Sequence, residues 1–311
     1  MPLKHEGDRR WVEMEFLVPG TPEQIWAAVA TGAGMTAWFT PTKVDERVGG
    51  AIEFDFGGGA SSSGKVIVWD PPVRLVYEEY GWSGDAPPVA TEVTVETRSR
   101  GRCVLRIVHS MFTTDDQWDD QFDGFEAGWP GFIEVLRIYL AHHPGAKAAV
   151  VRAPVIHSGD TAAAWSTLAG ELGLAGLDRE ARWTAPANLP AATGVLERIQ
   201  QDAGSHEAML RLDQPLPGVM YIGAYRWEAQ ARAVVILYLY GDRAARTRLG
   251  GVDGETIPGL RQVRPVSLTA GLMTGSAGVP GALRHSKRSR QPQPAASPRS
   301  RECCRPGRTP R

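Results

Sequence analysis

A long apolar stripe between Trp118 and Tyr139 restricts the possible folds of this chain more than any other feature. Large apolar residues recur there at spacings of four and three residues, in strict alternation: Trp118, Phe122, Phe125, Trp129, Phe132, Leu136 and Tyr139. This period is that of one face of an α-helix. The sequence therefore predicts a long amphipathic helix from Trp118 to about His142, kinked at Pro130 and ended by Pro144-Gly145.

Short strand-like runs bounded by turn residues precede this helix. After the run Trp11–Val18, a capping box at Thr21 predicts a first helix, and a second short helix is expected from Met35 to Phe39. Five more runs follow in hairpin order: Ala51–Phe56, Lys65–Asp70, Arg74–Trp82, Ala90–Arg98 and Arg102–Ser110. This order predicts an α+β fold, in which the long helix lies across the concave face of a curved antiparallel sheet.

Residues 150–262 look like a partial second copy of the same order. Asp160 is placed to cap a helix with Trp165 five residues on, just as Thr21 precedes Trp26 by five. Four strand-like runs follow without a closing amphipathic helix: Gly194–Gln200, Glu207–Leu212, Val219–Trp227 and Ala233–Tyr240. We expect a first domain at residues 8–146 and a degenerate half-repeat at 150–262, which either encloses no cavity or packs on the first domain. A disordered Arg/Pro/Ser-rich tail is expected at 263–311.

Charge is divided unevenly along the chain. Nine Lys or Arg residues and one acidic residue lie between Arg284 and the end, whereas the rest of the chain has 25 basic and 34 acidic residues. An acidic folded part argues against a nucleic-acid-binding surface. No apolar run approaches the length of a membrane helix, and the polar start MPLKHEGDRR lacks the apolar core of a signal peptide. We expect a soluble, cytoplasmic, bacterial protein that binds neither nucleic acid nor membranes.

Residue spacing suggests neither a metal nor a cofactor, and we expect none. Cys103 lies in a strand pattern, Cys303 and Cys304 are adjacent, and no CxxC motif occurs. The segment 57–64 (GGGASSSG) lacks the Gly-Lys-Ser/Thr entry into a helix that a phosphate-binding loop needs. It is therefore predicted to be a flexible hairpin loop.

Several motifs along residues 11–145 together resemble the SRPBCC superfamily of START-like proteins. In order, they are TPEQIWAAV, GMTAWF, GKVIVWDPPVRLVYEEYGW, TEVTVETRSRGRCVLRIVHSMF and WDDQFDGFEAGWPGFIEVLRIYL. Within that superfamily, the chain is most similar to the activator of heat-shock-protein ATPase homologue family. The resemblance implies a helix-grip fold, a curved antiparallel sheet wrapped round the C-terminal helix with a cavity between them. It implies no fixed catalytic set, because members range from ligand carriers and cyclases to co-chaperones.

Candidate site residues follow from the alternation along the strands. In Arg102–Ser110, His109 is expected on the cavity face and Arg106 on the solvent face. His109 is then either a hydrogen-bonding or acid/base group for a ligand, or a satisfied core histidine bonded to the last helix. Glu78 and Glu79 face opposite sides of their strand, and an inward carboxylate is a candidate general acid, unless both are solvated. His109 and Glu78 are the candidate catalytic residues.

Eight residues are predicted to line the cavity, although ordinary core packing of the aromatic residues is the alternative interpretation. They are Trp38, Phe39, Tyr77, Trp82, His109, Phe112, Trp129 and Phe132.

Three functions are compatible with these patterns. The leading hypothesis is a non-enzymatic module that binds a hydrophobic small molecule in the helix-grip cavity, with a stress-related role as part of this expectation. It fails if the domain's own Trp and Phe side chains fill the pocket. The second is a co-chaperone-like module that binds a protein partner, and the third is a cyclase or hydratase acting on a hydrophobic substrate.

Overall fold

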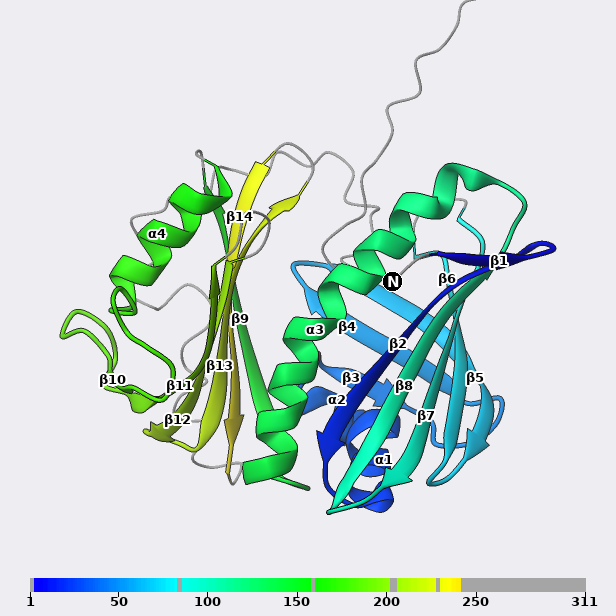
Figure 1. The fold of residues 1–311 in the computed structure, drawn as a ribbon, viewed down its shortest axis with the longest axis horizontal. Coiled ribbons are helices and arrows are strands. Elements are labelled where there is room, and N and C mark those ends of the chain that lie inside the picture. The colour runs from blue at the N-terminus through cyan, green and yellow to red at the C-terminus, as the bar shows by residue number, and fades with distance from the viewer. Residues whose placement is uncertain (1–2, 83–85, 158–159, 202–205, 228–229, 242–311) are drawn as a thin grey trace, which may run out of the picture.

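Two antiparallel sheets and four α-helices form the described part of the chain (Figure 1). The computed structural model describes residues 3–82, 86–157, 160–201, 206–227 and 230–241. The expected tail at 263–311, and the end of the predicted second half from residue 242, lie outside these ranges.

The first sheet has eight strands in the order β1-β2-β8-β7-β6-β5-β4-β3, and every neighbouring pair is antiparallel. Its strands are β1 (Lys4–Glu6), β2 (Arg9–Pro19), β3 (Thr42–Val44), β4 (Ala51–Gly57), β5 (Ala60–Asp70), β6 (Arg74–Tyr80), β7 (Val89–Arg98) and β8 (Arg102–Phe112). The curved antiparallel sheet expected from the alternating runs is therefore present.

The hairpin between β4 and β5 is tighter than predicted. The expected eight-residue loop is a turn at Gly57–Gly59, and the strand resumes at Ala60. All three glycines have positive φ (78°, 62° and 84°), a conformation that glycine adopts without a Cβ clash. The small residues that follow, ASSSG, pair with β4 and β6 instead of forming a loop.

The first two helices follow β2 and place side chains against the sheet. Helix α1 (Pro22–Ala30) begins with the predicted capping box, in which Thr21 and Gln24 exchange side-chain and backbone hydrogen bonds. Helix α2 (Gly32–Thr36) begins three residues before the predicted start at Met35, because the Thr31 hydroxyl caps the backbone N–H of Gly34.

The long helix predicted from the apolar stripe is confirmed as α3 (Asp119–His142), preceded by a 3-10 turn at Asp116–Trp118. Three of its stripe residues are almost completely buried: Phe122, Leu136 and Tyr139. The side chain of Phe125 lies outside the described part. Helix α3 continues through Pro130. It lies in the middle of the chain, and most of the other described elements are strands.

The second sheet has six strands in the order β10-β11-β12-β13-β14-β9. They are β9 (Ala148–His157), β10 (Arg182–Thr184), β11 (Thr193–Gln201), β12 (His206–Gln214), β13 (Gly218–Trp227) and β14 (Gln230–Tyr240). Helix α4 (Thr161–Glu171) begins at the predicted cap, Asp160. In both sheets an early strand pairs with the last one, β2 with β8 and β9 with β14.

Helix α3 lies between the two sheets, and α4 covers the far face of the second sheet (Figure 1). One continuous core joins the first sheet, α1–α3 and the inner face of the second sheet. Two hydrogen bonds cross this junction, from the Tyr238 hydroxyl to the carbonyl of Phe39 (2.7 Å) and from the Tyr240 hydroxyl to that of Ala37 (2.9 Å). The second sheet therefore packs on the helical side of the first. A separate core fills the space between the second sheet and α4.

Among the described residues, no helix is both long and apolar enough to cross a membrane.

Candidate functional site

An internal cavity of about 20 Å³ lies between the concave face of the first sheet and the helices. A space of this size holds about one water molecule. Strands β4, β6, β7 and β8 form its sheet wall, and α1, α2, the segment after α2, and α3 form its helical wall. The lining residues are Val29, Met35, Trp38, Phe39, Phe54, Tyr77, Val93, Leu105, Ile107 and Trp129.

Three aromatic side chains on the helical wall occupy most of the space that a larger cavity would have. The Phe39 ring stacks on Trp129 with a centroid distance of 5.3 Å, and Trp38 lies 5.7 Å from Phe39 and 6.1 Å from Trp129. Phe132 meets Phe39 edge-on at 5.0 Å and stacks on Tyr221 of the second sheet at 5.8 Å. The concave face is thus covered by a cluster of rings that contact one another.

Trp38, Phe39, Tyr77 and Trp129 line the cavity, as the sequence predicts. The other predicted lining residues lie elsewhere. Trp82 donates from its indole nitrogen to the carbonyl of Pro87 (2.8 Å) and meets Trp118 edge-on, near the start of α3. Phe112 is 59% exposed, because it ends β8 on the side away from the buried face. Phe132 packs between Phe39 and the second sheet.

His109 is buried behind Trp129 and does not line the cavity. Its Nδ1 lies 2.9 Å from the Thr91 hydroxyl, and its Nε2 accepts a hydrogen bond of 2.6 Å from the Trp129 indole. Burial lowers the pKa of His109 to about 3, so the imidazole is neutral at neutral pH. Both ring nitrogens have a protein partner, as in the alternative interpretation of a core histidine bonded to the last helix.

The inward carboxylate on β6 belongs to Glu79 and not to the predicted Glu78. Leu75, Tyr77 and Glu79 share one face of the strand, whereas Glu78 points outward and accepts a hydrogen bond of 2.6 Å from the Tyr80 hydroxyl. Burial raises the pKa of Glu79 to about 7, although the Ser62 hydroxyl donates to its carboxylate and opposes this shift. Strand β7 separates Glu79 from His109, so the two do not form an acid/base pair.

Residues 19–141 match the model of the family described as activator of Hsp90 ATPase homolog 1-like protein. This part of the chain is therefore similar to that family. The match begins at the end of β2 and ends within the last turn of α3, so it contains every residue that lines the cavity.

Several solved structures are similar to the chain at low sequence identity. DynU16, from the dynemicin biosynthetic locus, is 18% identical over 81% of this chain and 96% of its own, with a TM-score of 0.38. CalU16 from Micromonospora echinospora is 19% identical over 43% and 78% (TM-score 0.35). The Aha1 dimer from Colwellia psychrerythraea is 22% identical over 43% and 98% (TM-score 0.35). No curated protein matches the chain.

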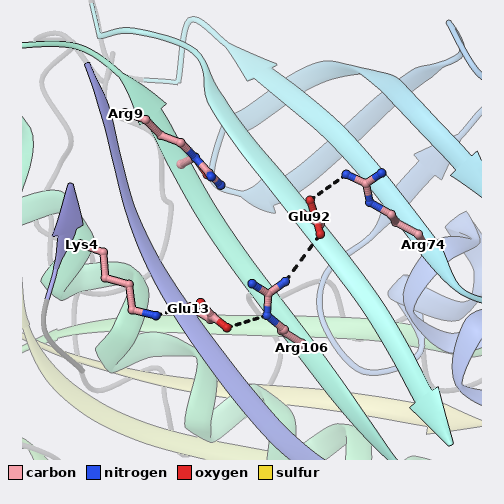
Figure 2. A network of polar contacts seen from close by, with 7 residues as sticks. Lys4, Arg9, Glu13, Arg74, Glu92 and Arg106 are labelled. Carbon is pink, nitrogen blue, oxygen red and sulfur yellow. Dashed lines mark hydrogen bonds and ion pairs between the residues drawn. The ribbon is translucent and has the colours of Figure 1, made fainter. Parts of the chain in front are cut away.

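The outer face of the first sheet carries a chain of ion pairs (Figure 2). The carboxylate of Glu13 contacts Lys4 at 2.9 Å and Arg106 at 2.6 Å, and Glu92 links Arg106 at 3.6 Å to Arg74 at 3.0 Å. Arg106 thus lies on the face opposite to His109, as predicted. Hydrogen bonds from Arg106 and Lys4 lower the pKa of Glu13 to about 2.

Alternation along β8 places Leu105 and Ile107 on the cavity face, where the structure has them, but four other lining residues were not singled out by the sequence: Val29, Met35, Phe54 and Val93. For the strand residues a usable signal was present, because each alternates with polar neighbours along its strand. Among the described residues, no group of three or more His, Cys, Asp or Glu side chains is arranged to hold a metal ion.

Proposed function

We propose that the chain is a binding protein for an apolar small molecule, held between α3 and the concave face of the first sheet. We further propose the domain division expected from the sequence, with a helix-grip domain at 8–146 that forms the site and a half-repeat at 150–262 that covers its helical side. The supporting observation is an apolar space bounded by the sheet on one side and by Trp38, Phe39 and Trp129 on the other. Apolar linings with few polar groups are usual for such sites.

The domain's own rings leave a volume of only about 20 Å³, so the expectation of a preformed open pocket fails. The proposal therefore requires that a ligand displaces side chains. Phe39 and Trp129 are the side chains to move, because they stack on each other at 5.3 Å and cover the sheet wall. In α3, Trp129 is followed by Pro130, which has no backbone N–H to donate to the helix. The cavity of about 20 Å³ is therefore a closed form of the proposed site.

Native mass spectrometry and a thermal-shift titration of the full chain with indane, a small rigid hydrocarbon, test this function. We expect saturable binding, about tenfold tighter in Phe39→Ala, because removal of the ring enlarges the cavity. Val93→Phe fills the cavity and is expected to abolish binding. Val104→Phe places the same ring on the opposite face of the sheet and serves as its matched control. Absence of binding by both the wild type and Phe39→Ala contradicts the proposal.

The small volume also favours a second candidate, a co-chaperone-like module that binds a protein. The family description, activator of Hsp90 ATPase homolog 1-like, gives the partner to test. The ATPase rate of an Hsp90-type chaperone is measured with and without a molar excess of the full chain. An increase in that rate supports this candidate, and an unchanged rate together with indane binding leaves the small-molecule function.

A further inference from the structure

One row across the concave face of the first sheet carries two charged residues, Glu79 on β6 and Arg10 on β2. Val89 on β7 and Met111 on β8, both buried, separate them. Both carboxylate oxygens of Asp119, at the start of α3, accept hydrogen bonds from Arg10, so the positive charge of this row is already paired. The negative charge of Glu79 is left to find its partner elsewhere.

The Glu79 carboxylate has a hydrogen-bond donor beside it but no cation. The Ser62 hydroxyl donates to one of its two oxygens. Among the described residues, no lysine, arginine or histidine forms an ion pair with Glu79. A carboxylate that leaves water without a partner of opposite charge is costly, and burial accordingly raises the pKa of Glu79 to about 7. A positive charge placed next to this carboxylate offsets a cost that the fold leaves uncompensated.

Glu79 borders the cavity where β5 and β6 form the sheet. Tyr77, the previous residue on the same face of β6, lines the cavity, and so does Phe54, which pairs with Ser62 across β4 and β5. Two residues along a strand span about 7 Å, so the carboxylate lies one side chain beyond the cavity wall. Tyr77 and Phe54 are buried, whereas Glu79 is partly exposed. A molecule that enters at this end meets a carboxylate next to aromatic rings, whose faces also attract cations.

We propose that the site selects apolar molecules that carry one protonated amine, and that the Glu79 carboxylate binds the ammonium group while Tyr77 and Phe54 contact the apolar part. The interaction is an ion pair with hydrogen bonds, and no covalent bond forms. This inference rests on the proposed small-molecule function. It adds the chemical class of the ligand and the residue that recognises it.

A matched pair of probes, 2-aminoindane and indane, tests recognition of the ammonium group, because the two differ by one amine. Titrations of the full chain at pH 8 keep the Glu79 carboxylate ionised and the amine protonated. We expect 2-aminoindane to bind about tenfold more tightly than indane, as one charge-assisted hydrogen bond gives. Glu79→Gln keeps the size of the side chain and should remove this preference without changing the affinity for indane. Glu78→Gln, at the outward neighbour on the same strand, is the matched control and should keep the preference.

A third probe of the same shape, indane-2-carboxylate, tests the sign of the charge without any substitution. We expect the wild type to bind it at least tenfold more weakly than indane, because two carboxylates then lie side by side. The order ammonium, hydrocarbon, carboxylate in the wild type supports the inference even if Glu79→Gln fails to fold. Any other order in the wild type contradicts it.

The outcomes separate the two proposals. If indane binds and 2-aminoindane has no advantage, or if a folded Glu79→Gln keeps the advantage, the role of Glu79 is wrong and the small-molecule function stands. If none of the probes binds the wild type or Phe39→Ala, the small-molecule function is wrong and the inference about its ligand is wrong with it.

Discussion

At the scale of single residues, Glu13 shows how the outer face of the sheet depends on charge. Its ordinary pKa of 4.5 falls to about 2 in the folded protein, because its carboxylate accepts hydrogen bonds from Arg106 and Lys4 (Figure 2). A group whose pKa is lowered on folding adds stability above its unfolded pKa and loses that stability as the pH falls through its folded pKa. Glu13 therefore stabilises the fold at neutral pH, and this contribution disappears between about pH 4.5 and pH 2.

Glu13→Gln is expected to lower the free energy of unfolding by about 1 kcal/mol at pH 7, the upper range for a partly exposed ion pair. The difference from the wild type should shrink below pH 4.5, because both proteins then lack the charge. Urea denaturation at pH 7 and pH 3 measures both values. Glu53→Gln is the matched control, since its pair with Lys43 is 3.4 Å long and exposed on both sides. A constant difference at the two pH values argues against the ionic origin.

Also at this scale, the sequence predicts the face on which a residue lies better than it predicts the contacts of that residue. Alternation correctly separates His109 from Arg106, and Glu78 from Glu79, because the strand period is two. It does not decide which of two adjacent glutamates is the inward one. Nor does it reveal that Trp129, on α3, bonds to His109, because that contact depends on where the helix crosses the sheet.

At the scale of elements, strongly periodic segments were predictable and short or edge segments were not. The stripe from Trp118 to Tyr139 predicts α3 almost to the residue, because a 24-residue helix repeats its pattern many times. Strand β9 was not predicted, because Pro154 interrupts the run. The structure accommodates this proline because β9 is the edge strand of the second sheet and pairs only with β14. Strands β1, β3 and β10 have three residues each, too few to show a period.

Pro130 carries a prediction for α3. It is exposed and lies inside the helix, where it removes the backbone hydrogen bond to the residue four positions earlier. Pro130→Ala restores this donor and should slow amide hydrogen exchange along the first half of α3, with a gain in stability of about 1 kcal/mol. Exchange measured by mass spectrometry on peptides covering residues 119–130 checks this. Pro144→Ala, just beyond the helix end, should leave these peptides unchanged, and equal exchange in the wild type and Pro130→Ala contradicts the prediction.

At the scale of the whole molecule, the second sheet and the cavity are parts of one structure. The core of the first sheet continues into the inner face of the second, which contributes Val234, Ile236 and Tyr238. The Tyr238 hydroxyl holds the backbone carbonyl of Phe39, the residue whose ring covers the cavity. The second sheet therefore anchors the backbone of Phe39, and we expect this sheet to limit access to the site.

The double variant Tyr238→Phe/Tyr240→Phe tests this coupling. It keeps both rings but leaves the carbonyls of Phe39 and Ala37 without these donors, and a lost buried hydrogen bond costs about 1–3 kcal/mol. We expect a lower free energy of unfolding and, because Phe39 is held less firmly, a faster association of indane in stopped-flow measurements. Tyr80→Phe, on the exposed side of β6, should change neither quantity. If the double variant loses stability while the association rate stays the same, the second sheet stabilises the molecule without controlling the cavity, and access must depend on α3 and Trp129 alone.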